Sequence, residues 1–532
     1  MGKIWQLGNT TVRSALRIRD GLIAYKKSGL EGRIRRADGD AAFRNLLGSC
    51  GVVSLGEDVS NSVGRKWRSA MAKLGFIYPE IPESTGLSQN DIGPLDYITQ
   101  AGNALIEADT TPAIQEVYLR AMVVPTEKVK EGRFSPLVWT LKILLHLERK
   151  GENSFLSFSE FALFVQTSTP EDGYEGVCRN ISNYRTAKKR TLSAKRFKRD
   201  SFDLKAKEVG YKSGTIRDYA DENLRYLKAT GMFRAKGNGI ILAPERKYLA
   251  IQITGALISD ISPYRMYRLL CEGADLPTDS AVVAKAALDS LVEQAEGMGI
   301  ECSFSGDEVQ DAVQINRIRY RIEEQISRKR EREFASQQKD KVPEIIAYLE
   351  LLAGDVKKKK LPDGNEIALR KDEAPAYFEW TVWRAFLAVD NLVNEPFEVR
   401  RFNVDGDFLP VSTAPGNGPD LIAEFAECIL AIEVTLSTGS RQEAMEGEPV
   451  RRHVARLVEQ NEKPVIGLFI AVNVDTNTIE TFRHGIWYTT SDERLDLNIT
   501  PLSLAQFTSV LKVALESENV SYRRILELMN EC

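Results

Sequence analysis

The spacing of hydrophobic residues separates the chain into a helical first half and a sheet-containing last third. Residues 136–148, 156–167 and 214–230 repeat apolar side chains at helical intervals. Residues 428–435 and 465–471 are instead almost continuously apolar, which is typical of strands in the middle of a covered sheet. The pattern therefore predicts a multidomain α/β protein with a mostly helical N-terminal region.

Two segments of the first half have the residue order of a winged helix. After the helix at 214–230, two short apolar runs meet at Gly237-Asn238-Gly239, which predicts a hairpin. Near Gly64 a basic helix start precedes a short apolar piece, although any small helix-and-strand packing would give the same pattern. We expect winged-helix-like subdomains at 1–125 and 126–261.

The next region is helical and densely charged. Residues 262–370 lack a sustained heptad, so they predict a helical linker that ends at Lys357–Lys360 and the turn at 362–364. Residues 371–532 then form the last domain. Its expected order is a helix at 376–392, a strand near 399–404, a strand leading to Asp420, the strand 428–435, a helix at 444–461 and the strand 465–471.

This last domain has the αβββαβ order of many nuclease cores, and it carries two notable acids. Asp420 follows Gly416-Asn417-Gly418-Pro419, and Glu433 lies inside an apolar strand. A carboxylate is costly to bury there without a cation or an arginine partner. Asp420, Glu433 and the backbone carbonyl of Val434 would offer Mg²⁺, or Mn²⁺ as a substitute, the oxygen ligands that it prefers.

A lysine two residues after the second acid is the usual companion of such a site, and here Thr435 stands in its place. No lysine occurs between Lys371 and Lys463. A lysine general base is thus excluded from this window, and further carboxylates are the natural replacement. Glu446 and Glu379 are the candidates, and four acids would favour two cations sharing one phosphate.

Charge is divided unevenly along the chain. Residues 1–250 hold 40 Lys and Arg against 28 Asp and Glu, whereas the remainder holds 31 against 47. The net charges of +12 and −16 indicate that the first half meets a polyanion, although a solvated basic surface is the alternative. The basic positions expected to contact DNA are Arg65, Lys66, Arg68, Lys188, Lys189, Arg190, Lys195, Arg196, Arg217, Arg225, Arg234 and Lys236.

Other classes of protein are disfavoured. No apolar run approaches the roughly 20 residues needed to cross a bilayer, and the first residues lack the apolar core of a signal peptide. The six cysteines show neither a CxxC pair nor clustering with histidine, so no zinc site or disulfide framework is indicated. We expect a cytoplasmic bacterial protein that does not bind membranes.

The acidic segments resemble a known family. Residues 378–383, 410–420, 433–439 and 442–453 are similar to the AlwI-, PleI- and MlyI-type family of type IIS restriction endonucleases, which includes site-specific nicking endonucleases. Residues 230–238 resemble its recognition domain. The resemblance implies winged-helix recognition, a helical linker, and a PD-(D/E)xK domain that hydrolyses a phosphodiester with metal-activated water a few base pairs outside an asymmetric site.

The same resemblance assigns roles to individual residues. Glu379, Asp420, Glu433 and Glu446 would form the metal site with the carbonyl of Val434, and the family also replaces the lysine. His453 would contact the scissile phosphate, with a role in the core or on the helix surface as the alternative.

The resemblance also implies partners. They are double-stranded DNA, a cognate DNA methyltransferase, and a transient homodimer or separate small subunit for the second strand. A catalytically inactive winged-helix regulator and a transposition endonuclease remain open.

Overall fold

The computed structural model describes residues 4–53, 62–191, 193–236, 239–256, 261–305, 309–354, 358–361, 364, 366–369, 373–416, 418–439, 441–489, 492–516, 523 and 527. The chain divides into two compact units, Met1–Ile326 and Ser327–Cys532. The division falls inside the predicted linker, within the 25-residue helix α15 (Ala312–Ser336). No helix among the described residues is long and apolar enough to cross a membrane.

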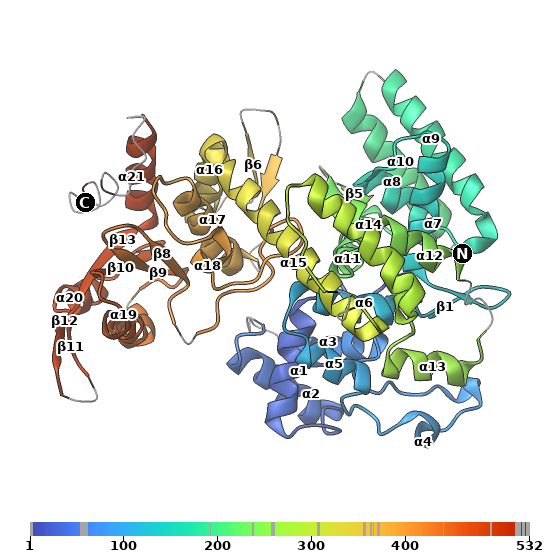
Figure 1. Cartoon of the computed structure of the whole chain (residues 1–532), viewed down its shortest axis with the longest axis horizontal. Helices are drawn as coiled ribbons and strands as arrows, with labels where there is room; N and C mark the ends of the chain where they lie inside the picture. The colour runs from blue at the N-terminus through green and yellow to red at the C-terminus, as the bar shows by residue number, and fades with distance from the viewer. Residues whose placement is uncertain are drawn as a thin grey trace. The chain divides into compact units, whose positions relative to one another are not determined.

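The first unit is built mainly of helices around one large apolar core. Trp5, Tyr25, Phe43 and Tyr118 are among its fully enclosed side chains. A second, smaller core joins α14 to the first part of α15 through Leu288 and Ile322. The main helices are α1 (Arg17–Ser28), α2 (Arg36–Ser49), α3 (Ser62–Lys73), α5 (Gln100–Glu107), α6 (Thr111–Met122), α7 (Pro136–Arg149), α9 (Tyr174–Arg190), α10 (Ala194–Val209), α11 (Ser213–Ala229), α12 (Lys247–Gly255), α13 (Pro263–Glu272) and α14 (Ala281–Gly297) (Figure 1).

Residues 126–261 contain a three-stranded sheet. The two strands after α11 form the hairpin that the sequence predicted, whereas the third strand, at Leu156–Ser157, lies where the sequence predicted the start of a helix, which begins only at Phe158. Strand β5 (Gly239–Leu242) lies between β3 (Leu156–Ser157) and β4 (Phe233–Lys236). A Cβ atom on Gly239 would lie 2.0 Å from the Leu156 carbonyl oxygen, so only glycine allows this close approach. The predicted turn residues Gly237 and Asn238 lie outside the described residues.

The expected strand after α3 is much shorter than predicted. In the described part of residues 1–125, the apolar piece contributes only an isolated bridge between Ile77 and Ile98. Gly75 adopts a positive φ of 72°, which turns the chain, and Pro79 and Pro82 follow without amide donors. A longer ladder therefore has no room to form.

The end of the predicted linker is also different from the expectation. After α16 (Val342–Ala353), β6 (Lys358–Lys360) and β7 (Glu366–Ala368) form an antiparallel pair, so the lysine run is a strand. Lys358 pairs with Glu366 across this hairpin, which offsets the repulsion within the run. Lys357, Pro362 and Asp363 lie outside the described residues.

The second unit has a mixed four-stranded sheet in the order β13-β10-β9-β8. Strand β8 (Leu421–Glu424) is antiparallel to β9 (Ile429–Thr435), while β10 (Val465–Ala471) runs parallel to β9 and to β13 (Asn498–Ser503). The helices α17 (Ala374–Leu387), α19 (Glu448–Gln460) and α21 (Leu504–Glu516) lie beside the sheet (Figure 1).

Side chains of β9 alternate between two apolar cores. Leu430 and Ile432 join the core that contains α17, whereas Ala431 joins the core that contains Val454 of α19. This alternation, the ordinary geometry of a strand, places Glu433 on the α19 face. The apolar strands 428–435 and 465–471 predicted from the sequence are therefore the two central strands of the sheet.

The chain before Asp420 departs from the prediction. Residues 396–399 form the short helix α18 (Pro396–Val399), and the strand expected near 399–404 is reduced to bridges at Arg400 and Val404. The strand expected to lead to Asp420 begins only after it, at Leu421. Pro410, Pro415 and Pro419 interrupt the donors that a continuous strand would need.

Candidate active site

The two acids singled out in the sequence meet where β8 begins and β9 ends. Leu421 pairs with Ile432 in the antiparallel register, which brings Asp420 beside the last residues of β9. The backbone amide of Val434 donates a hydrogen bond of 2.8 Å to Asp420 Oδ2. Asp420 is therefore fixed against the strand that carries Glu433.

Glu433 is held from the α19 side of the sheet. Its Oε1 lies 2.6 Å from Nδ1 of His453, a buried residue of α19. The other ring nitrogen of His453, Nε2, is enclosed and has no hydrogen-bond partner among the described residues. His453 is thus buried against Glu433 and does not lie on the outer surface of its helix, which was one of the alternatives.

Glu379 enters the site from α17. Only 5% of this residue is exposed, and its Oε2 accepts a 2.7 Å hydrogen bond from the amide of Ala414. Ala414 belongs to the loop that precedes Asp420, so one bond links the helix to the loop. Asn417 of the same loop lies outside the described residues.

Glu446 lies in a short π-helical segment, Glu443–Gly447, which leads into α19. The Thr435 hydroxyl donates to Glu446 Oε1 over 2.8 Å. Gln442, just before this segment, is fully buried and donates to the carbonyls of Ser437 and Asn473. The residue that replaces the usual lysine therefore orients the fourth carboxylate.

The electrostatics of the site are those of crowded acids. Burial, and then the charge of Asp420, raises the pKa of Glu379 well above its usual value. Burial, and then the charge of Glu433, does the same to the pKa of Asp420. The pKa of Glu433 is raised to about 8, first by burial and next by Glu446. A cation among these groups would offset both the desolvation and the repulsion.

His453 titrates in the opposite direction. Its pKa is lowered to about 4, first by burial and then by the positive charges of Arg452, Arg401 and Arg456. The imidazole is therefore neutral at neutral pH. It acts as a hydrogen-bonding partner of Glu433 and adds no positive charge to the site.

The donor chemistry suits a hard divalent cation. Carboxylate oxygens from Asp420 and Glu433 lie beside the backbone of Val434, and oxygen ligands are what Mg²⁺ prefers. Across the described residues, no three Asp, Glu, His or Cys side chains are already gathered into a metal-holding group. Each of the four site carboxylates instead gives one oxygen to a protein donor.

One residue of the site was missed in the sequence. Arg401 lies next to Asp420, because its amide donates to the Asp420 carbonyl over 3.2 Å and its guanidinium Nη1 donates to the Pro419 carbonyl over 2.9 Å. Its charge lowers the pKa of Asp420 and of Glu433. The sequence did hold a signal for this residue. Arg401 lies in the segment near 399–404 that was predicted to be a strand next to the one leading to Asp420.

The basic positions predicted to meet DNA differ in their exposure. Arg68 is tied to Asp40 at 2.7 Å, Arg225 to Asp221 at 3.3 Å, and Arg234 to Glu245. Lys66 is half-buried. The exposed ones are Arg65, Lys188, Lys189, Arg190, Lys195, Arg196, Arg217 and Lys236.

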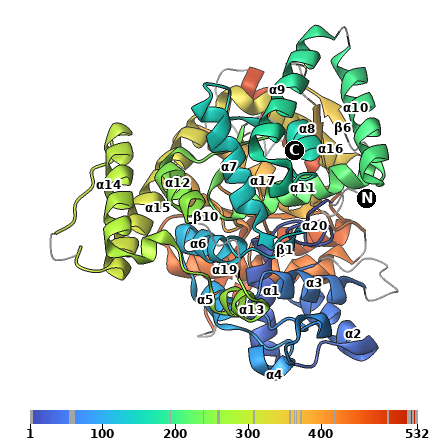
Figure 2. The ribbon, with the colours of Figure 1, turned by 90° about the vertical axis from the view of Figure 1, so that its right-hand side faces the viewer.

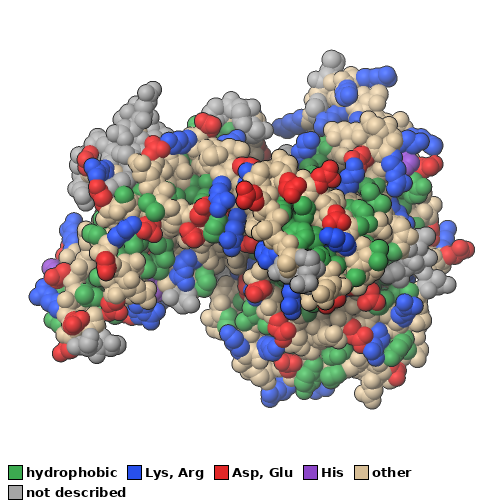
Figure 3. Space-filling view, viewed as in Figure 1, with side chains coloured by type: hydrophobic (Ala, Val, Ile, Leu, Met, Phe, Trp, Pro, Cys, Tyr) green, Lys and Arg blue, Asp and Glu red, His purple; other side chains and the backbone are tan. Residues whose placement is uncertain are grey.

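Five of the exposed cations form one group, which we call the basic tip: Lys188, Lys189 and Arg190 at the end of α9, with Lys195 and Arg196 at the start of α10. The two helices lie side by side in both ribbon views, and Tyr184 of α9 contacts Phe197 of α10 at a ring distance of 5.2 Å (Figures 1 and 2). Blue side chains gather there in the space-filling view (Figure 3).

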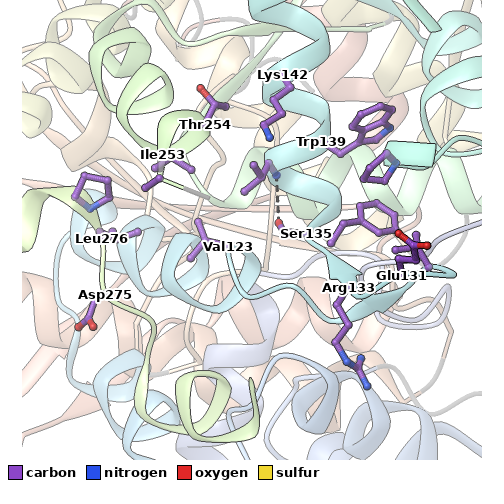
Figure 4. Close-up of a pocket in the computed structure, with 16 residues that line it drawn as sticks. Val123, Glu131, Arg133, Ser135, Trp139, Lys142, Ile253, Thr254, Asp275 and Leu276 are labelled. Carbon is purple, nitrogen blue, oxygen red and sulfur yellow. Dashed lines mark hydrogen bonds between the residues drawn. The ribbon is translucent and has the colours of Figure 1, made fainter. Parts of the chain in front are cut away.

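A cavity of about 210 Å³ lies in the first unit. Phe134, Trp139 and Val138 supply apolar walls, and Lys142 reaches toward the space from α7 (Figure 4). Burial lowers the pKa of the Lys142 ammonium. No residue predicted to be catalytic, metal-binding or DNA-binding lines this cavity, so it is separate from the acidic site.

A family model matches most of the chain. The model of the AlwI restriction endonuclease family covers residues 72–510, a span that includes all four site acids and His453. The family resemblance inferred from the sequence is thereby confirmed. No curated protein matches the chain.

Several solved structures are similar at low identity. The small subunit of the heterodimeric restriction endonuclease R.BspD6I shares 19% identity over 35% of this chain and 87% of its own, with a TM-score of 0.28. The BpuJ1 endonuclease binding domain, in complex with pyrene- and phenanthrene-modified DNA, shares 14% identity over 44% of this chain and 85% of its own, with a TM-score of 0.29. Restriction endonuclease FokI shares 12% over 98% of both chains, with 0.27. At these TM-scores the superpositions contribute nothing to the functional argument.

Proposed function

The chain belongs to the AlwI restriction endonuclease family, and we propose that it is a Mg²⁺-dependent type IIS restriction or nicking endonuclease with a PD-(D/E)xK active site. The proposed enzyme binds a short asymmetric duplex site and hydrolyses a phosphodiester a few base pairs away. The single observation that carries the chemistry is that Asp420 is bonded to β9 beside Glu433, while Glu379 is bonded to the loop before Asp420 and Glu446 to Thr435 at the end of β9.

We infer that the cation is held by Asp420, Glu433 and the carbonyl of Val434, with Glu379 and Glu446 beside it. Raised pKa values at buried acids indicate that the site favours added positive charge. When bound, Mg²⁺, or Mn²⁺ in its place, supplies Lewis acid chemistry that activates water and stabilises negative charge on the leaving oxygen.

The protein's own residues position the reaction. Val434 fixes Asp420, His453 fixes Glu433, and Thr435 orients Glu446. A water oxygen forms a new bond to phosphorus while the bond to the 3′ oxygen breaks, which leaves a 5′-phosphate and a 3′-hydroxyl. The proton lost by water passes to a carboxylate, for which Glu446 and Glu379 are the candidates, and the 3′ oxygen takes a proton from solvent.

Recognition is proposed for the first unit. The order α7, β3, α11, β4 and β5, with β5 between the other two strands, supports a winged helix in residues 126–261. Residues 1–125 have the helices for a second one, but their described part has only a bridge in place of a wing. Exposed Arg217 and Lys236 are available to DNA on α11 and β4.

The partners follow from the chemistry of a single site. One active site severs one strand at a time, so cutting both strands requires a second copy or a separate small subunit. We further propose that a cognate DNA methyltransferase protects the host's own sites.

Cleavage of plasmid DNA tests the proposed function. The wild-type chain with Mg²⁺ should give ends at a fixed distance from one sequence when both strands are sequenced. Asp420→Asn should lower the single-turnover rate roughly 1,000-fold, because it removes a ligand whose cation contributes several kcal/mol to transition-state stabilisation.

The matched control is Asp496→Asn, at an exposed aspartate of the same unit whose carboxylate pairs with Arg494. It should cleave normally. Binding that protects DNA without scission in the wild-type chain would instead identify a DNA-binding regulator, and full activity of Asp420→Asn would exclude the proposed site.

A further inference from the structure

Arg401 is aimed at the acidic site by the segment that carries it. Arg400 is extended and forms a bridge with Leu421, and the next amide, that of Arg401, donates to the Asp420 carbonyl. Arg400 turns to Glu331, with Nε 2.7 Å from Oε1, while Arg401 turns to the loop before Asp420. The two neighbouring arginines therefore bind different partners.

The loop is shaped to admit the Arg401 guanidinium. A Cβ atom at position 418 would lie 2.1 Å from Nη1 and 2.8 Å from Cζ of Arg401, so any side chain there would displace it. Nη1 also donates to the carbonyl of Pro419. Gly418 and Pro419 thus hold the Arg401 guanidinium next to Asp420 in the chain.

Arg401 is bonded twice to the segment that carries Asp420, through its amide to the Asp420 carbonyl and through its guanidinium to the Pro419 carbonyl. Arg452 lies on α19 instead, where its Nε is paired with Glu448 at 2.9 Å. Of these two arginines, Arg401 is the one held by the loop before Asp420.

The nearest lysine after the site does not supply this charge. Lys463 lies 2.5 Å from Glu424, at the opposite end of β8 from Asp420. Lys371, the last lysine before the site, lies outside the described residues. A phosphodiester entering the site brings negative charge next to four carboxylates, and a fixed cation is needed to offset their repulsion.

We propose that Arg401 is a catalytic residue that donates hydrogen bonds to a non-bridging oxygen of the scissile phosphate, in the role that a lysine fills in other nucleases of this chemistry. The inference rests on the proposed function. A guanidinium has five N–H donors in a planar fork, a geometry that matches phosphate oxygens. It takes no proton from water, because it stays charged.

Single-turnover cleavage at saturating DNA tests this role. Arg401→Met should reduce the rate roughly 100-fold, as expected for the loss of one donor to developing negative charge, with DNA affinity in EDTA little changed. Arg401→Lys keeps the positive charge but loses the planar pair of N–H donors, so it should retain an intermediate rate. Arg483→Met, at an arginine that is 68% exposed on the same unit, is the control and should cleave normally.

Two further measurements separate catalysis from folding. Guanidinium ion should restore cleavage to Arg401→Ala but not to Asp420→Asn. Gly418→Ala should reproduce the loss in the wild-type background and add little to Arg401→Met, because both act on the same group. A merely structural arginine would give neither rescue nor this non-additivity.

The outcomes distinguish the two proposals. If the wild-type chain cleaves and Asp420→Asn does not, the proposed function stands, and a wild-type rate for Arg401→Met then overturns the role of Arg401 alone. If the wild-type chain cleaves no duplex DNA, both are overturned.

Discussion

At the scale of residues, the acidic site is organised by hydrogen bonds from the protein to each of its four carboxylates. The donors or partners are two backbone amides, one hydroxyl and one imidazole, from Ala414, Val434, Thr435 and His453. None of them is a cation, so the bonds orient the acids without neutralising them. The crowded negative charge that remains is what a divalent cation offsets.

The hydroxyl of Thr435 donates to Glu446 and accepts from the amide of Ser437. Thr435→Val keeps the shape of the side chain but removes the hydroxyl that orients Glu446. We expect the single-turnover cleavage rate to fall about 5-fold, the effect of roughly 1 kcal/mol from one hydrogen bond, with DNA affinity unchanged.

The control for this substitution is Thr508→Val, which removes a hydroxyl bonded to the Leu504 carbonyl on α21. It should lower stability without a specific loss of cleavage. Equal rates for Thr435→Val and the wild-type chain would show that the hydroxyl does not position Glu446.

At the scale of elements, residues 185–199 contain eight Lys and Arg and no acid, and the structure divides this basic run into two parts. Arg185 is only 19% exposed and pairs with buried Glu160 at 2.9 Å, so it fastens α9 to the first unit. The basic tip is exposed, and Arg196 pairs with the exposed Asp200 of its own helix at 3.6 Å. Cations at the end of α9 also complement the helix dipole, but five so close together favour an added anion.

Replacing all five basic-tip residues with glutamine should weaken DNA binding and flatten its salt dependence. Each phosphate contact that is lost makes the slope of log K against log salt less steep by about 0.9. Affinities measured at several salt concentrations give this slope directly.

Arg268→Gln with Lys285→Gln is the control, because both residues are partly exposed on the first unit and pair with acids of their own helices. An unchanged slope for the basic-tip variant would reduce the tip to ordinary solvated surface.

At the scale of the whole molecule, each of the two units has an apolar core of its own. In the first unit the start of the chain returns to α11, where Asn223 accepts from the amide of Leu7 and donates to the carbonyl of Trp5. Beside it, Gln6 donates to Glu222, which is only 1% exposed. Burial raises the pKa of Glu222 to about 7, although the bond to Gln6 opposes the shift.

The raised pKa makes the stability of the first unit depend on pH. The unfolded chain has the ordinary glutamate value of 4.5, so the contribution of Glu222 is fully present below that pH and is lost as pH rises through about 7. Glu222→Gln should match the wild-type chain near pH 4.5 and be more stable by about 2 kcal/mol at pH 8.

Calorimetric unfolding of both chains at the two pH values measures this difference. Glu208→Gln, at an exposed glutamate of α10, should show no such pH dependence. The same stability difference at both pH values would contradict the assignment to Glu222.

The sequence by itself determined the helical first half, the central strands of the sheet and the pair Asp420 and Glu433. These features can be predicted from local spacing, because periodicity and a charged residue within an apolar run do not depend on contacts between distant segments. The lysine-free window likewise directed attention to Glu379 and Glu446. The family match supports the reading of these segments.

Only the tertiary structure decided how distant residues meet. The hydrogen bond from Thr435 to Glu446, the approach of Arg401 to Gly418, and the division of arginines between ion pairs and exposed surface all depend on packing between separate segments. The strands expected before Asp420 and after α3 were overestimated for the same reason. A strand exists only where a partner and free backbone donors are available, and prolines and turns removed them.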